Sequence, residues 1–259
     1  MFSFKKNKYI LDFVTSIMFF TRIPVNWSYF SKKPPELTKA AWSFPLVGLL
    51  IGLLAGLIGD LFIYLELPIF LSCVIAISIS VILTGAFHED GLADSADGLG
   101  AGGSPEKIDK IMHDSRLGTY GAVALILGLL MRLALIPPLI DSGYSLVSIL
   151  SIAFATGKLA IMFTRNYFSH SKFAKIGSIV GKISRKQLVS ASLIWVFPTL
   201  YIFPFLGVLL GTIFTTLVVF LLGKKAKKAL GGITGDILGA TAFLAELTFL
   251  MGVLVIIKI

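Results

Sequence analysis

The chain has 259 residues, of which 56% are hydrophobic and only 14% are charged, and its mean hydropathy is +0.91. Soluble domains carry about 25% charged residues, so this composition excludes a soluble protein and indicates an integral membrane protein. The 23 Lys and Arg outnumber the 14 Asp and Glu, which gives a formal net charge of +9. We assign that excess to cytoplasmic loops and anionic membrane lipid, and not to nucleic acid.

The hydrophobic runs predict an all-α, polytopic membrane bundle that forms a single domain over residues 1–259. Residues 9–20 predict an amphipathic helix that is too short to cross about 30 Å of hydrocarbon, so we place it at the membrane interface. Glycines at i, i+4 spacing between Gly48 and Gly59 predict close helix packing. About seven spans are predicted, at 41–64, 69–87, 118–140, 145–164, two within 187–222, and 236–257.

Positive charges lie in alternate connections between the predicted spans. The connections that carry Lys or Arg are 28–40, 88–117, 165–186 and 223–235. The intervening turns that carry neither are 65–68, 141–144 and the turn near 204. The positive-inside rule places the first set in the cytoplasm. We therefore expect a protein of the bacterial plasma (inner) membrane with a site that faces the cytoplasm.

The most unusual stretch runs from His88 to Tyr120. Seven of the 14 acidic residues and two of the three histidines lie within it. A carboxylate left alone in hydrocarbon costs several kcal/mol or changes its protonation state, so this stretch needs either solvent or a cation. If it is helical, Asp90, Asp94 and Asp97 are i, i+4, i+7 and share one face. Their hard oxygen ligands favour Mg²⁺, or Mn²⁺, over zinc. The alternative is a solvated polar loop between two membrane helices.

Histidine and arginine side chains near this stretch offer further chemistry. His88 and His113 could act as base or acid near neutral pH, or could donate hydrogen bonds to carboxylates. Arg116 and Arg22 could hold phosphate, although Arg22 could equally snorkel at a helix end. The lysines between 224 and 228 could anchor the chain at anionic headgroups or attract an anionic substrate.

Two ionisable residues fall inside predicted spans. Arg132 lies 14 residues beyond Gly118 and Glu246 lies 10 residues beyond Asp236, so helical rise places them within about 6 Å in depth. We expect them to pair in the bundle interior. The alternative is that each finds water or backbone partners separately.

Four strings resemble the cobalamin synthase family, also called the adenosylcobinamide-GDP ribazoletransferases. They are His88-Glu-Asp-Gly-Leu-Ala-Asp-Ser-Ala-Asp-Gly-Leu99, residues 111–121, residues 20–24 and residues 231–236. Asp94-x-x-Asp97-Gly98 also resembles the start of the metal motif of CDP-alcohol phosphotransferases, but the rest of that motif is absent. A lipid head-group transferase and a cation-coupled transporter remain the alternatives. A transporter more typically places its ion ligands near the membrane midplane, whereas these acids cluster at the mouth of the bundle.

The resemblance implies a GMP-releasing phosphotransferase that joins adenosylcobinamide-GDP to α-ribazole or its 5′-phosphate. It implies Mg²⁺ as cofactor, with Mn²⁺ as the alternative, because such transfer depends on charge neutralisation. A homo-oligomer is compatible with the sequence, and no nucleic acid is expected. The expected metal ligands are Asp90, Asp94, Asp97, Glu89 and Asp236; the catalytic residues are His88, Asp114, Arg116 and His113; the substrate-binding residues are Arg22, Ser115, Thr119, Tyr120 and Thr234.

Overall fold

The computed structural model describes residues 7–174 and 181–259. This part of the chain is almost entirely helical, and its one β contact is an isolated parallel bridge between His170 and Ile233. The prediction of an all-α membrane bundle is therefore confirmed. The α-helices are α1 (Lys8–Phe20), α2 (Leu37–Ala40), α3 (Phe44–Tyr64), α4 (Ile69–Thr84), α5 (Phe87–Ala101), α6 (Pro105–Met112), α7 (Thr119–Asp141), α8 (Leu146–Tyr167), α9 (Arg185–Ile202), α10 (Phe205–Leu230) and α11 (Gly235–Lys258).

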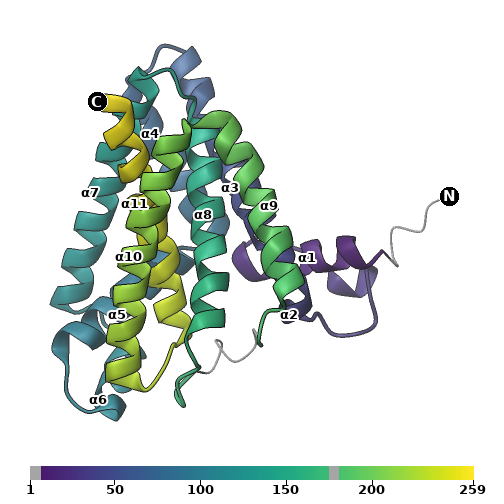
Figure 1. The fold of residues 1–259 in the computed structure, drawn as a ribbon, viewed down its shortest axis with the longest axis vertical. Helices are drawn as coiled ribbons and strands as arrows, with labels where there is room; N and C mark the ends of the chain where they lie inside the picture. Colours follow the sequence, from purple (N-terminus) through teal and green to yellow (C-terminus); the bar gives the residue numbers. More distant parts are fainter. Residues whose placement is uncertain (1–6, 175–180) are drawn as a thin grey trace.

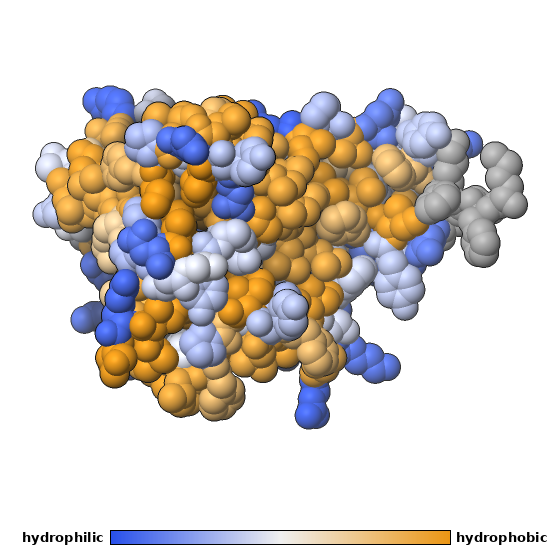
Figure 2. Space-filling view, turned by 90° about the horizontal axis from the view of Figure 1, so that it is seen from above, coloured by the Kyte–Doolittle hydropathy of each residue, from blue (hydrophilic) through white to orange (hydrophobic). Residues whose placement is uncertain are grey.

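The long helices run side by side along the long axis of the molecule (Figure 1). The C-terminus lies at one end of this bundle, and α6 lies at the opposite end. Large apolar side chains are exposed along the flanks, among them Leu57 on α3, Ile126 on α7 and Leu217 on α10. Hydrophobic residues also cover much of the surface in the end-on view of Figure 2. An exposed surface this apolar is suited to lipid and not to water.

The predicted count of about seven spans is not confirmed. Five helical segments are long and apolar enough to cross a membrane by themselves, and a sixth span requires α4 and α5 to count together although they are bent by 86°. The predicted second span at 69–87 in fact ends at Thr84. α9 is not apolar enough to count as a span, because Arg185, Lys186 and Gln187 occupy its first turn. The five segments are Leu37–Tyr64, Thr119–Asp141, Leu146–Tyr167, Phe205–Leu230 and Gly235–Lys258.

α1 forms where the short amphipathic helix was predicted, and Figure 1 shows it lying across the side of the bundle. Its polar residues face inward: Trp42 donates to the Asp12 carboxylate at 2.8 Å, and the hydroxyls of Ser16 and Ser43 are 2.8 Å apart. Its first turn leaves Tyr9 65% exposed on the outer face, whereas Phe20 at its last residue is buried in the core. This orientation is compatible with the membrane interface, where its position stays a prediction.

α8 is the central helix and is buried along most of its length. The glycines of α3 pack directly on its backbone, as their spacing predicted. A Cβ on Gly56 would lie 2.5 Å from the Val147 Cα, and one on Gly52 would overlap the backbone of Ser151. Close packing of two backbones maximises van der Waals contact where lipid removes the hydrophobic driving force between helices.

Candidate active site

The acidic stretch begins at a sharp turn between α4 and α5. Gly85 and Ala86 both adopt left-handed backbone conformations, with φ of 67° and 59°. Glycine accepts this geometry freely, whereas alanine is strained in it. The Arg22 side chain packs against Gly85, and the Arg22 backbone N–H donates to the Leu83 carbonyl at 2.6 Å. The turn sends α5 across the end of the bundle at 86° to α4, so that α5 does not itself act as a span.

α5 is helical from Phe87 to Ala101, which confirms the geometry assumed for the acidic spacing. It packs against the start of α11 through two glycines. A Cβ on Gly91 would lie 2.7 Å from the Asp236 carbonyl oxygen and 2.9 Å from the Gly239 Cα. No larger residue permits this approach, which brings Asp236 on the first turn of α11 to the helix that carries Asp90 and Asp94.

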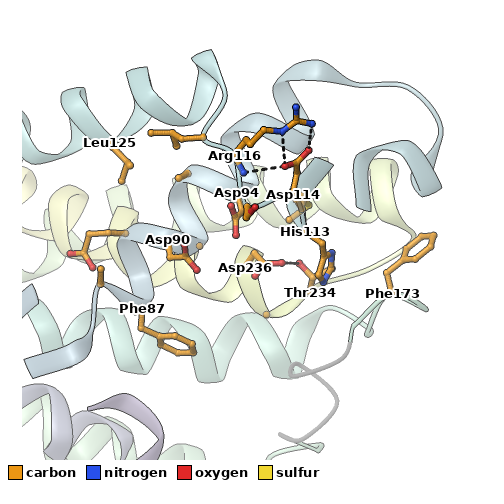
Figure 3. Close-up of a pocket in the computed structure, with 18 residues that line it drawn as sticks. Phe87, Asp90, Asp94, His113, Asp114, Arg116, Leu125, Phe173, Thr234 and Asp236 are labelled. Atoms are coloured by element: carbon orange, nitrogen blue, oxygen red, sulfur yellow. Dashed lines mark hydrogen bonds and ion pairs between the residues drawn. The ribbon is translucent and has the colours of Figure 1, made fainter. Parts of the chain in front are cut away.

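These helices enclose a cavity of about 600 Å³, which we call the acidic cavity. Figure 3 shows Asp90, Asp94 and Asp236 grouped at its centre, with Phe87 and Phe173 on opposite sides. Aromatic and aliphatic side chains thus complete the walls around the carboxylates. The lining residues are Ala86, Phe87, Glu89, Asp90, Gly91, Ala93, Asp94, Met112, His113, Asp114, Ser115, Arg116, Leu117, Leu125, Phe173, Thr234, Gly235 and Asp236.

The three central carboxylates have no basic partner of their own. Across the described ranges, neither Asp90, Asp94 nor Asp236 forms an ion pair with Lys or Arg. Burial, and then the charges of Asp90 and Asp236, raise the pKa of Asp94 from 3.8 to about 7, and His113 opposes this shift. A buried carboxyl whose pKa is raised by neighbouring acids marks a candidate functional site.

The donor set fits a hard divalent cation, but the geometry is open. Within residues 7–174 and 181–259, no three His, Cys, Asp or Glu side chains stand close enough to hold a metal ion directly. Mg²⁺ usually keeps several waters and takes only one or two carboxylates, together with substrate phosphates. Asp90, Asp94 and Asp236 supply oxygen donors of that kind, so metal binding stays a prediction that these residues fit.

Asp97 has a different environment from the other two aspartates of its helix. Its two carboxylate oxygens accept hydrogen bonds from the backbone N–H groups of Gly118 and Gly121, each at 2.8 Å. Asp97 therefore satisfies free donors at the start of α7. It does not line the acidic cavity. The predicted face shared by Asp90, Asp94 and Asp97 is thus divided, and Asp236 takes the third position beside the first two.

The loop before α7 supplies the cationic side of the cavity. Arg116 holds Asp114 in a fork, with its Nε and a terminal nitrogen 3.1 and 2.8 Å from the two carboxylate oxygens. Hydrogen bonds from the Arg116 side chain and backbone lower the pKa of Asp114 from 3.8 to about 2. The Arg116 side chain is 87% exposed, so it remains accessible to an anionic ligand. His113 lies beside Asp109, with its Nδ1 3.3 Å from the carboxylate.

Two predicted site residues point away from the cavity centre into a buried group of charges. Glu89 borders the cavity but binds Arg132 at 2.9 Å, and Arg132 also binds Glu246 at 2.8 Å, which confirms the predicted Arg132–Glu246 pair. His88 is 5% exposed and does not line the cavity. Its Nδ1 lies 3.5 Å from both Lys158 and Glu246. We call Glu89, Arg132, Glu246, Lys158 and His88 the interior charge cluster.

The remaining substrate-binding candidates are divided between the cavity and its surroundings. Ser115 and Thr234 line the cavity, and the Thr234 hydroxyl also caps α11 by accepting from the Ile237 N–H at 3.4 Å. Arg22, Thr119 and Tyr120 do not line it, although Arg22 lies beside the turn that opens it. The Tyr120 ring instead packs against Gly100 of α5.

Sequence reasoning missed Lys158 and Phe173. Lys158 is fully buried in α8, and its position inside an apolar run was the signal that could have identified it. Phe173 lies in the loop after α8, and nothing in its local sequence distinguishes it. Only the packing of that loop brings its ring to the acidic cavity.

Comparison with known proteins gives a consistent result. Residues 12–254 match the family described as cobalamin-5-phosphate synthase. The chain is 36% identical to an adenosylcobinamide-GDP ribazoletransferase of Azorhizobium caulinodans, over 97% of this chain and 98% of that protein. It is 35% identical to one of Clostridium botulinum strain Okra, over 95% and 98% of the two chains. It is 34% identical to one of Ralstonia pickettii, over 93% of each.

No solved structure matches the chain. The family match and the curated relatives each cover nearly the whole sequence. The strings that first suggested the resemblance supply most of the residues that line the acidic cavity. The chain belongs to the cobalamin-5-phosphate synthase family.

Proposed function

We propose that this protein joins adenosylcobinamide-GDP to α-ribazole, or to α-ribazole 5′-phosphate, and releases GMP. The product is adenosylcobalamin or its 5′-phosphate. The observation that carries the proposal is a cavity whose centre holds three unneutralised carboxylates and whose rim carries the exposed Arg116. This arrangement suits a pyrophosphate that arrives with a cation, and the relatives are named for a substrate of that class.

The reaction is a phosphoryl transfer. A ribose hydroxyl oxygen of the ribazole forms a bond to the phosphorus that carries the cobinamide, the bond from that phosphorus to the GMP oxygen breaks, and the hydroxyl proton passes to a base. Catalysis of this kind depends on positioning and charge stabilisation more than on covalent chemistry. Mg²⁺, with Mn²⁺ as the alternative, would be held by one or two of the carboxylates of Asp90, Asp94 and Asp236, together with water and substrate phosphate, and would neutralise charge on the pyrophosphate.

Other residues of the cavity are placed to bind phosphate, to form hydrogen bonds with the substrate and to accept the proton. Arg116 is placed to bind a phosphate oxygen, with Asp114 fixing the orientation of its guanidinium group. Ser115 and Thr234 offer hydroxyl groups inside the cavity. Of the two histidines considered as the base, His113 lines the cavity and His88 does not, so the geometry favours His113 as the proton acceptor.

We place this site at the cytoplasmic face of a bacterial plasma membrane. The basic connections predicted to be cytoplasmic include the segment that holds His113 to Arg116, and α6 of the same segment lies at the end of the bundle opposite the C-terminus. A cytoplasmic cavity has access to soluble nucleotide substrates and can release GMP directly.

The test uses purified full-length protein in lipid nanodiscs, supplied with adenosylcobinamide-GDP, α-ribazole and Mg²⁺. We expect GMP release that requires α-ribazole and stops when the metal is chelated. Asp94→Asn is the matched loss-of-function control, because it keeps side-chain shape and removes one charge. GMP release without ribazole, or no turnover while a diacylglycerol acceptor does react with a CDP-alcohol, would contradict the proposal. Cation-driven uptake without turnover would favour the transporter alternative.

A further inference from the structure

A second cavity lies away from the acidic one, between α8, α9 and α10. It has a volume of about 570 Å³ and a lining that is almost entirely apolar, with Phe249 of α11 at its floor. Figure 1 shows α9 and α10 meeting near one end of the bundle and spreading apart toward the other, with α8 between them. The cavity is thus a groove on the flank of the bundle. Its other aromatic lining residues are Phe163, Tyr167, Phe168, Trp195 and Phe220.

One buried hydroxyl group in the lining of this groove has no partner. Thr164 is 2% exposed, and its hydroxyl makes no hydrogen bond within the described part of the chain. The other threonines of the lining do find acceptors: Thr156 donates to the Ile152 carbonyl and Thr212 to the Val208 carbonyl, at 2.8 and 2.7 Å. A buried hydroxyl without a partner is costly. The Thr164 hydroxyl is therefore suited to an acceptor that enters the groove.

The groove has a basic end. The Lys224 ammonium lies 5.3 Å from the centre of the Phe220 ring, which is part of the lining. The Phe168 ring, also part of the lining, packs directly on Gly223. Further lysines continue along the last turns of α10, at 225, 227 and 228. An apolar groove that ends at ammonium groups is complementary to a ligand with a hydrocarbon chain and an anionic head.

The polar groups of the groove lie toward one of its ends. Thr164 lies three residues before the end of α8, at the end of the groove where Phe168 packs on Gly223. Thr156 and its partner Trp195 lie eight residues deeper, or about 12 Å by helical rise. Along the groove, the ammonium group of Lys224 comes first, the buried hydroxyl of Thr164 second and the apolar lining at Trp195 last.

We propose that this groove binds one anionic phospholipid. The acyl chain lies between α9 and α10 against Trp195, an ester oxygen accepts a hydrogen bond from Thr164, and the phosphate lies at Lys224. The site is independent of the phosphotransfer chemistry, because none of its lining residues is shared with the acidic cavity. It makes a lipid a stoichiometric ligand of this protein and not only its solvent.

Trp195 provides the probe for the test. Bromine atoms on an acyl chain quench tryptophan fluorescence on contact, and a background with Trp27→Phe and Trp42→Phe leaves Trp195 as the only tryptophan. The full chain is placed in phosphatidylcholine nanodiscs that contain increasing fractions of brominated phosphatidylglycerol. The reciprocal series uses brominated phosphatidylcholine in phosphatidylglycerol. Circular dichroism and size-exclusion chromatography check each variant for folding.

We expect saturable quenching at a much lower mole fraction of brominated phosphatidylglycerol than of brominated phosphatidylcholine. Lys224→Gln should raise the half-quenching fraction about fivefold, the ratio that corresponds to one lysine at an anionic surface. Lys225→Gln is the matched control, because it removes the same charge from the next position of the helix. Thr164→Val should weaken quenching, whereas Thr241→Val, which removes another unpartnered buried hydroxyl outside the groove, should not.

Three outcomes would overturn the proposal. Quenching that rises linearly and equally for both lipids would show ordinary surrounding lipid only. Equal effects of Lys224→Gln and Lys225→Gln would show diffuse attraction to a basic surface and no defined site. No quenching by either lipid would show that acyl chains do not enter the groove.

Discussion

The acidic cavity and the interior charge cluster lie on two sides of the first turns of α5. They differ in whether their carboxylates have basic partners. In the cluster, Glu89 and Glu246 share Arg132, and Lys158 adds a second positive charge beside them. In the cavity, Asp90, Asp94 and Asp236 stand together, and no Lys or Arg of residues 7–174 or 181–259 forms an ion pair with them. Charges that the fold has already paired hold helices in place, whereas charges left unpaired are available for a ligand.

One short helix, α5, contributes residues to both regions. Successive residues of α5 point in different directions, so Glu89 reaches Arg132 while Asp90, one residue later, lines the cavity. The cluster joins α5 to α7 and α11 and adds Lys158 of α8, and the Gly91–Gly239 contact fixes α5 against α11. The position of the cavity carboxylates therefore depends on the cluster behind them.

The largest effect on stability should come from breaking the cluster. Arg132→Ala or Glu246→Ala leaves a buried charge without its partner, which costs about 3–5 kcal/mol. The double variant should lose less than the sum of the two, because the charges stabilise each other. Chemical unfolding in detergent measures this coupling. Additive losses would show that the 2.8 Å pair between Arg132 and Glu246 carries no coupling energy. The cluster would then not stabilise the helix packing through this pair.

The largest effect on activity alone should come from the cavity. Asp90→Asn and Asp94→Asn should fold and insert normally but lose roughly 10²-fold or more in turnover, about 2.7 kcal/mol of transition-state stabilisation. Raised Mg²⁺ should partly rescue a variant that weakens only metal affinity. The measurement is GMP release, with Glu106→Gln as the milder control, because Glu106 lies outside the cavity lining and pairs with the exposed Lys172. Near-normal turnover in Asp94→Asn would show that these carboxylates are only solvated.

Asp97→Asn should separate the structural role of Asp97 from the catalytic role of Asp94 on the same helix. An asparagine amide keeps one acceptor for the N–H groups of Gly118 and Gly121 but places a donor against the other, so we expect a loss of about 1–3 kcal/mol in stability. Turnover per folded molecule should fall less than in Asp94→Asn. Thermal unfolding and specific activity measured on the same samples distinguish the two. Normal stability with abolished turnover would place Asp97 among the metal ligands.

A smaller effect should appear in the pH dependence of stability. The pKa of Asp94 is raised from 3.8 to about 7, so protonation favours the folded state. Without metal, the contribution of Asp94 to stability should decline as pH rises between about 4 and 7 and should then stay low. Mg²⁺ should therefore raise the Tm more at pH 8 than at pH 5. An equal Mg²⁺ effect at both values would show that the cation binds elsewhere.

The smallest perturbation tests whether the acidic cavity opens to the cytoplasm. A reporter fused after Ile259 should read as periplasmic, and one inserted in the segment 165–186 should read as cytoplasmic. Figure 1 shows the C-terminus at the end opposite α6, as this arrangement requires. Both reporters on one side of the membrane would contradict the predicted order of spans.

The sequence by itself determined the features that depend on composition and local spacing. Apolar content indicated a membrane bundle, i, i+4 glycines predicted close helix packing of the first span, and the depths of Arg132 and Glu246 predicted their pair. Helical periodicity also placed Asp90 and Asp94 one turn apart on one helix. The four strings led to the correct family. Each of these inferences uses only the rise and period of a helix or a pattern contiguous in the chain.

Only the tertiary structure decided what each side chain meets. Asp97 has the spacing of a third metal ligand, but the start of α7 takes both of its oxygens. Asp236 comes from the far end of the chain and joins the cavity because Gly91 and Gly239 let α5 and α11 touch. His88 turns inward to Lys158, and the turn at Gly85 and Ala86 ends a predicted span early. Spacing fixes the direction of a side chain on its own helix, whereas its partner depends on which distant helix packs against that face.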